Sequence, residues 1–119
     1  MSYSFESNGE TLWDPALRIG KMYVSYAKGM EDVLGVPSGL SPTDQDWADV
    51  DPVSFAGFVS ELCEWYFSSP NWLLHGLMRT MLMTSLVMLE RAGGELPAVV
   101  HTDGDFVAEL KQTARHMNV

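Results

Sequence analysis

The chain has 119 residues, 46% of them hydrophobic, and a net charge of −9 from 16 acidic and 7 basic residues. This length predicts one domain, residues 1–119, with one core. The acidic charge argues against nucleic acid or an anionic membrane surface as partner and favours a basic protein. A single cysteine excludes an internal disulfide, and no secretory signal pattern is present, so we expect a cytoplasmic protein.

Residues 2–13 are predicted to form a β-hairpin. Tyr3 and Phe5 alternate with polar residues, and the Asn8-Gly9 dipeptide readily adopts the positive φ angles of a type I′ turn. With this pair as the loop, Phe5 is expected opposite Leu12, on an apolar face that packs against helices.

Two helices are predicted from Asp-Pro pairs, in which Asp caps the helix and Pro takes its first position. The first starts at Asp14-Pro15 and stops at Gly35, and its expected core stripe is Ile19, Tyr23, Tyr26, Met30 and Val33. The second starts at Asp51-Pro52, and its expected core stripe is Phe55, Val59, Leu62 and Tyr66. Residues 35–50 are rich in turn formers and are predicted to be a loop, with one helical turn at residues 43–48.

Residues 70–92 are predicted to be the central helix, with a Ser-Pro start and a Gly-Gly stop. Within residues 72–89 only His75 and Arg79 are ionisable, so the helix is apolar on nearly every side and has to be covered. The length also suits a membrane span, but an Arg in mid-bilayer costs about 2.5 kcal/mol or more. We therefore expect a buried helix and no membrane partner.

After a link that is extended at residues 98–101, a last, peripheral helix is predicted from Asp103 or Asp105 to about His116. The predicted class is therefore mainly α. It is a four-helix assembly around residues 70–92, with the hairpin of residues 2–13 packed on it.

Four segments carry a resemblance to a known family. They are Thr11–Pro15, Leu34–Leu40, Val50–Pro52 and Glu90–Gly93. Over roughly residues 1 to 93 the chain resembles a small actinobacterial family known only as a domain of unknown function. The resemblance implies a bacterial cytosolic origin and a shared fold, and it transfers no catalytic residue.

No catalytic motif is found, so the chain is predicted not to be an enzyme and no catalytic residue or cofactor is assigned. Cys63 and His75 could pair as a nucleophile and its base, but a buried structural cysteine is favoured. The acidic run at residues 44–51 fails the EF-hand pattern, since it has no Gly or Glu where calcium binding requires them. No metal site is predicted.

The central helix offers two candidate sites. His75 and Arg79, spaced i, i+4, form a polar notch that could bind a ligand or pair with acidic residues of the preceding helix, or simply be a satisfied buried pair. Small residues four apart, beside flexible Met side chains, suggest internal core packing or, alternatively, a homodimer contact or an apolar ligand cavity. The candidate residues for that contact are Gly76, Leu77, Thr80, Met81 and Thr84.

The third candidate is an acidic stretch without basic residues, from residue 29 to residue 78, which also contains Trp residues. Acidic side chains around aromatic anchors are typical of a surface that captures a basic protein, although a solvated loop with helix caps would look the same. The predicted partner-binding residues are Asp44, Asp46, Trp47, Asp49, Glu61 and Glu64. The leading hypothesis is an immunity or antitoxin-like inhibitor of a basic toxin, and the alternative is a dimeric accessory or ligand-binding protein.

Overall fold

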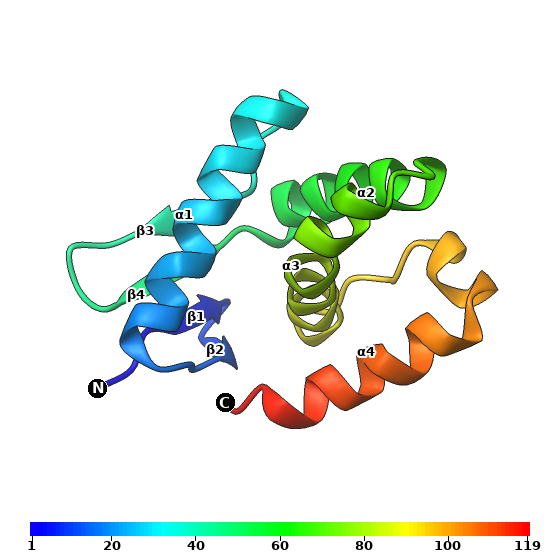
Figure 1. The fold of residues 1–119 in the computed structure, drawn as a ribbon. Coiled ribbons are helices and arrows are strands. Elements are labelled where there is room, and N and C mark those ends of the chain that lie inside the picture. Colours follow the sequence, from blue (N-terminus) through cyan, green and yellow to red (C-terminus); the bar gives the residue numbers. More distant parts are fainter.

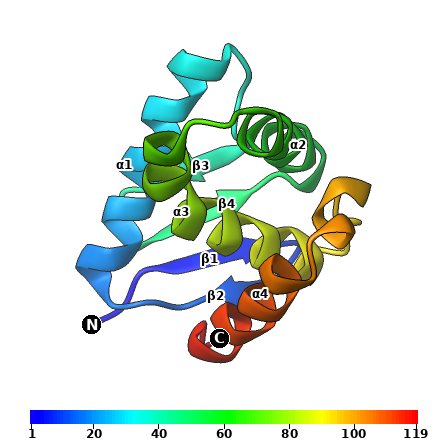
Figure 2. The ribbon, with the colours of Figure 1, turned by 45° about the vertical axis from the view of Figure 1, so that its right-hand side comes forward.

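The computed structural model describes all 119 residues as an α+β fold, in which four α-helices lie on one side of a four-stranded sheet (Figure 1). Figure 2 shows the helices in front of the strands. The elements in chain order are β1 (Ser4–Ser7), β2 (Glu10–Trp13), α1 (Leu17–Leu34), β3 (Leu40–Pro42), β4 (Trp47–Val50), α2 (Pro52–Ser68), α3 (Trp72–Arg91), the 3-10 helix η1 (Ala98–Thr102) and α4 (Gly104–His116).

The sheet has the strand order β2-β1-β4-β3. Neighbouring strands β1 and β2 are antiparallel, as are β3 and β4, whereas β1 and β4 run parallel, with Phe5 paired to Ala48. Two hairpins far apart in the sequence are therefore joined through their inner strands. The predicted mainly α class is wrong, because it lacked the second hairpin.

The second hairpin lies inside residues 35–50, which were predicted to be a loop with a helical turn at residues 43–48. Residues 47–50 alternate, with Ala48 and Val50 buried and Asp49 exposed, as in a strand with one covered face. Pro42 lies on β3, an edge strand, where a missing N–H is tolerated. The many turn-forming residues favoured a loop prediction, whereas the two short strands pair with each other and, through β4, with the distant β1.

The first hairpin is confirmed, but its predicted register is wrong. Asn8 and Gly9 form the turn with φ angles of 51° and 81°, as expected for the dipeptide. A register shift between Phe5 and Glu6 pairs Phe5 with Trp13 instead of Leu12. Leu12 and Trp13 are consequently both buried.

The predicted helix starts differ in accuracy. Asp51 caps α2 as expected, with its carboxylate accepting the Val53 N–H at 3.3 Å, and Asp103 caps α4. Asp14-Pro15 does not start α1. Those residues lie outside the helix, with the Tyr3 N–H bonded to the Pro15 carbonyl, and the helix begins at Leu17 without a side-chain cap.

The other element boundaries differ from the predicted ones by a few residues. The central helix begins after Asn71, which accepts two backbone N–H groups, instead of at Ser69-Pro70. The link at residues 98–101, predicted to be extended, is the 3-10 helix η1.

The predicted core stripe of α1 is partly wrong. Ile19 and Val33 are 48% and 63% exposed, and the buried positions are Gly20, Tyr23, Ala27 and Met30. The helix is rotated because Tyr3 packs directly on Gly20, where an added Cβ would lie 2.6 Å from Tyr3. A hydrophobicity pattern gives no weight to such a glycine. The stripe predicted for α2 is confirmed, since all four of its residues are buried.

Helix α3 is the centre of the core. Met78 and the continuous run from Met81 to Leu89 are buried, and α3 contacts α2, α4 and β2. By length and composition alone α3 could cross a membrane, yet 56% of its 18-residue window is buried inside the protein, as in a core helix. Its first turns, by contrast, leave Trp72, Leu73 and Leu77 exposed.

Candidate functional site

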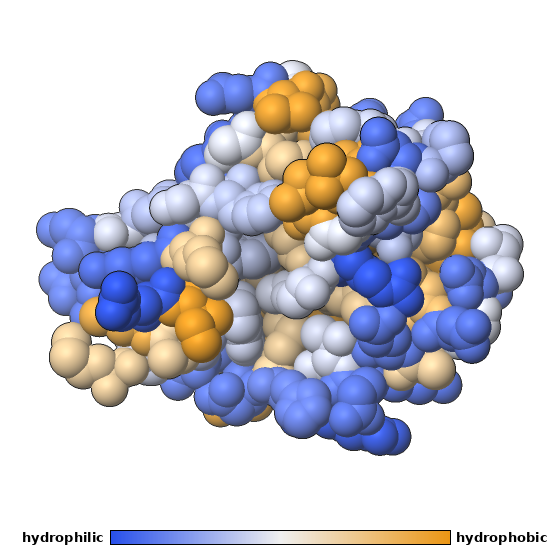
Figure 3. Space-filling model, in the orientation of Figure 1, coloured by the Kyte–Doolittle hydropathy of each residue, from blue (hydrophilic) through white to orange (hydrophobic).

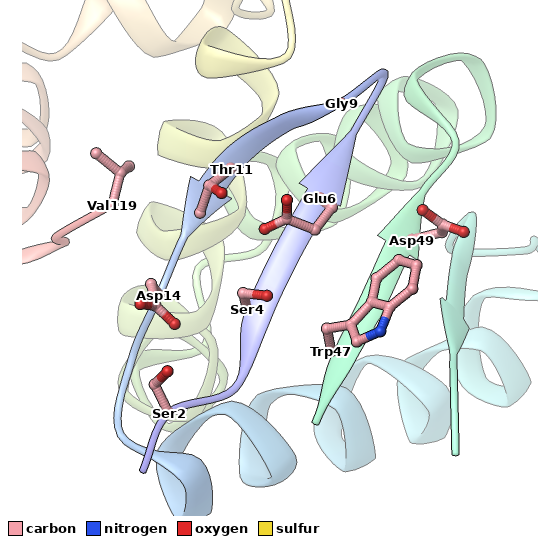
Figure 4. Close-up of a pocket in the computed structure, with 9 residues that line it drawn as sticks. All are labelled: Ser2, Ser4, Glu6, Gly9, Thr11, Asp14, Trp47, Asp49 and Val119. Carbon is pink, nitrogen blue, oxygen red and sulfur yellow. The ribbon is translucent and has the colours of Figure 1, made fainter. Parts of the chain in front are cut away.

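The sheet face turned away from the helices forms a shallow depression of about 640 Å³ (Figure 4). Strand alternation produces it, because Phe5, Ala48 and Val50 point into the core while their neighbours point outward. The outward side chains come from three strands and the chain ends: Ser2, Ser4, Glu6, Thr11, Asp14, Trp47, Asp49 and Val119, with Gly9 at the rim.

This acidic sheet face carries three carboxylates and no basic side chain. Glu6 comes from β1, Asp49 from β4, and Asp14 from the residue after β2. Glu6 and Asp49 are paired across the parallel strands, and half-buried Trp47 lies on the same strand as Asp49. Asp14 Oδ1 is buried without a hydrogen-bond partner. The face therefore presents negative charge around an aromatic ring.

The structure divides the six residues predicted to bind a partner. Trp47 and Asp49 line the acidic sheet face, and Asp44 and Asp46 lie on the adjoining β3–β4 turn. Glu61 and Glu64 are exposed on α2, and Glu64 lines a separate depression together with residues 97–99. The fold therefore does not gather the six residues into one surface.

Sequence reasoning missed Glu6 and Asp14. A signal for Glu6 was present, because it alternates with Tyr3 and Phe5 and so belongs to the polar face of the first hairpin. Its position beside Asp49 depends on the parallel β1–β4 pairing, which links residues more than 40 positions apart and leaves no local sequence signal. Asp14 was assigned to a helix cap, which it does not form.

His75 and Arg79, the predicted polar notch, are satisfied within the fold. Arg79 Nε donates to Glu109 Oε2 at 2.8 Å, and Nη1 donates to the Tyr66 hydroxyl at 2.6 Å. The hydrogen bond with Glu109 raises the pKa of Arg79. His75 stacks on Tyr66 and hydrogen-bonds its carbonyl oxygen at 2.8 Å. The acidic partner of Arg79 therefore lies on α4, and the contacts of His75 and Arg79 connect α2, α3 and α4.

Cys63 is buried, and burial raises the pKa of its thiol to about 12. A thiolate is the reactive form of cysteine, so this side chain is protonated and unreactive at neutral pH. No group of three or more His, Cys, Asp or Glu side chains is arranged to hold a metal ion.

A second hollow is apolar and lies between α1 and α3. This α1/α3 groove has a volume of about 370 Å³ and is lined by Trp13, Ile19, Met22, Tyr23, Tyr26, Leu77, Thr80, Met81 and Thr84. Four of the five residues predicted for a dimer or cavity line it, and the fifth, Gly76, is exposed on the same helix. The central helix is therefore incompletely covered along its first turns.

Two hydroxyl groups join the walls of the groove. The Tyr23 hydroxyl lies 2.6 Å from Ser85 Oγ, and the Tyr26 hydroxyl donates to the Leu77 carbonyl at 2.6 Å. Burial raises the pKa of both tyrosines, so both remain neutral donors. These bonds fix α1 against α3 while leaving the apolar surface between them open.

Taken together, these features define an α+β protein with one open acidic sheet face and one apolar groove. The chain belongs to the family of unknown function DUF6086, whose match covers residues 1–119. The resemblance to a family of unknown function, noted over residues 1 to 93, is thus confirmed and extends through α4. No curated protein and no solved structure matches the chain.

Proposed function

We propose that this chain is a non-enzymatic binding protein whose acidic sheet face captures a basic protein, in the manner of an immunity or antitoxin-type inhibitor. One observation carries the proposal. Glu6, Asp14 and Asp49, from three separate segments, line the same depression as Trp47, and no Lys or Arg lines it.

The chemistry of this face suits a basic protein partner. Carboxylates on an uncovered surface attract Lys and Arg side chains over roughly the Debye length, about 8 Å at physiological ionic strength, and so speed the encounter. Trp47 adds apolar contact area of the kind that dominates binding energy at interfaces.

The test uses charge reversal. The double variant Glu6→Lys/Asp49→Lys should weaken capture of immobilised small basic proteins by about tenfold or more, because it replaces attraction by repulsion at the contact. Binding is measured by surface plasmon resonance, and folding is checked by far-UV circular dichroism.

The matched control is Glu61→Lys/Glu64→Lys on α2. It produces the same change in net charge away from the acidic sheet face, so it should weaken capture much less. If the two double variants lose the same amount of binding to the basic proteins, only the net charge matters and the proposal is wrong. A further variant, Trp47→Ala, should weaken capture without altering the net charge.

A further inference from the structure

The α1/α3 groove continues onto exposed apolar side chains. Leu73 and Leu77 of α3 and Ile19 and Met22 of α1 are each about half exposed or more. Figure 3 shows hydrophobic surface over α1 and near the start of α3 on this side of the molecule. Ile19, Met22 and Leu77 line the groove itself, and Leu73 lies one turn before Leu77 on α3. A patch of exposed apolar side chains around a hollow is typical of an interaction surface.

The charge distribution indicates what can cover this patch. Residues 15–30 and 72–89, which form most of both walls, contain none of the 16 acidic residues and four of the seven basic ones. Two copies that each carry a charge of −9 repel one another wherever carboxylates meet. The α1/α3 groove, whose lining contains no Asp or Glu, is a surface on which two copies can approach without placing carboxylates in the contact.

The shape of the patch also suits a second copy. A two-fold interface brings the same patch together from both molecules, so the patch must contain both projections and the hollow that receives them. Leu73 and Leu77 project, while Trp13 and Tyr23 lie in the hollow beside them. Gly76 lies between the two leucines, and an added Cβ there would meet nothing within 4 Å, so another backbone has room to approach.

We propose that a second copy of this chain covers the α1/α3 groove in a two-fold symmetric dimer. Helix α3 crosses α3 of the other copy at Gly76, and Leu77 of each copy enters the groove of the other. This contact is separate from the acidic sheet face, so the proposal stands or falls independently of the proposed function.

The test is the mass of the purified full-length chain in solution, measured by sedimentation equilibrium and by light scattering after gel filtration. Wild type should have twice the 13.2 kDa chain mass. Leu77→Glu should weaken dimerisation by at least about tenfold, because it places a carboxylate in the apolar contact. Gly76→Gln should do the same by blocking the helix approach, although nothing in the single chain obstructs its Cβ.

The control is Val53→Glu, which makes the same kind of change at a residue 81% exposed on α2 and should leave the dimer intact. Circular dichroism verifies that each variant is folded. A mass of 13.2 kDa for wild type at all concentrations would overturn the proposal. It would do so even if the groove of that monomer binds an amphiphile or a different protein. So would a dimer that survives both Leu77→Glu and Gly76→Gln.

Discussion

One carboxylate, that of Glu31, fastens the end of α1 to the turn that follows. Its Oε2 accepts the Ser38 backbone N–H at 2.8 Å, the Ser38 hydroxyl, and Lys28 Nζ at 3.4 Å. The Ser38 hydroxyl is the main reason that the pKa of Glu31 is lowered. Ser38 is fully buried, so its polar groups depend on this acceptor.

The substitution Glu31→Gln should lower the free energy of unfolding by about 1–2 kcal/mol near neutral pH, because it removes the charge from these hydrogen bonds. A lowered pKa in the folded state stabilises the protein above the unfolded pKa, about 4.3 for Glu, and this contribution is lost as pH falls through the folded pKa. Urea unfolding of wild type and of Glu31→Gln at about pH 7 and about pH 3 should therefore show a difference in the free energy of unfolding that becomes smaller in acid.

The control for Glu31→Gln is Asp32→Asn, which removes one carboxylate at the exposed neighbouring position, where no side-chain hydrogen bond is made. It should change stability little at either pH. If Glu31→Gln lowers the free energy of unfolding by the same amount in acid as at neutral pH, the carboxylate charge is not the cause of the loss of stability.

At the scale of elements, the features predicted correctly from the sequence are those determined by interactions between neighbouring residues. The Asn8-Gly9 turn, the Asp51 cap of α2 and the apolar length of α3 each depend on residues close together in the chain. Strands β3 and β4 and the position of Glu6 beside Asp49 depend on a distant pairing, and the face of α1 depends on a glycine. Neither cause is visible in a local pattern, which is why the place of Glu6 in the acidic sheet face was missed.

The junction between β3 and α2 is a second element-scale feature, and it requires Gly39. Its φ is 77°, and an added Cβ would lie 2.8 Å from the Asp51 carbonyl oxygen and 2.9 Å from the Phe55 nitrogen. Gly39→Ala should therefore lower the free energy of unfolding by about 2–4 kcal/mol, from backbone strain plus the clash with backbone atoms.

The matched variant is Gly57→Ala in the exposed interior of α2, where an added Cβ meets nothing within 4 Å. This change should raise stability by about 0.5–1 kcal/mol, because alanine favours the helix. Urea midpoints of the two variants should thus shift in opposite directions. A small effect of Gly39→Ala would mean that β3 does not approach α2 as closely as the structure shows.

At the scale of the whole molecule, charge is segregated by surface. The acidic sheet face presents carboxylates without basic residues, whereas the walls of the α1/α3 groove contain no carboxylate. The sheet places its polar face outward and its apolar face under the helices, so the two surfaces arise from different elements. A chain built in this way could bind a basic partner on one surface and a second copy on the other at the same time.

Salt should therefore have opposite effects on binding at the two surfaces. Between about 0.05 and about 0.5 M NaCl, screening weakens attraction to a basic protein, so capture by the acidic sheet face should fall. The same screening reduces repulsion between two copies of charge −9 and leaves apolar contacts in place, so the dimer association constant should rise. Surface plasmon resonance and sedimentation equilibrium over one salt series measure both. A dimer that weakens with salt would indicate that its copies are held by ion pairs, and capture that is indifferent to salt would contradict a role for Glu6 and Asp49.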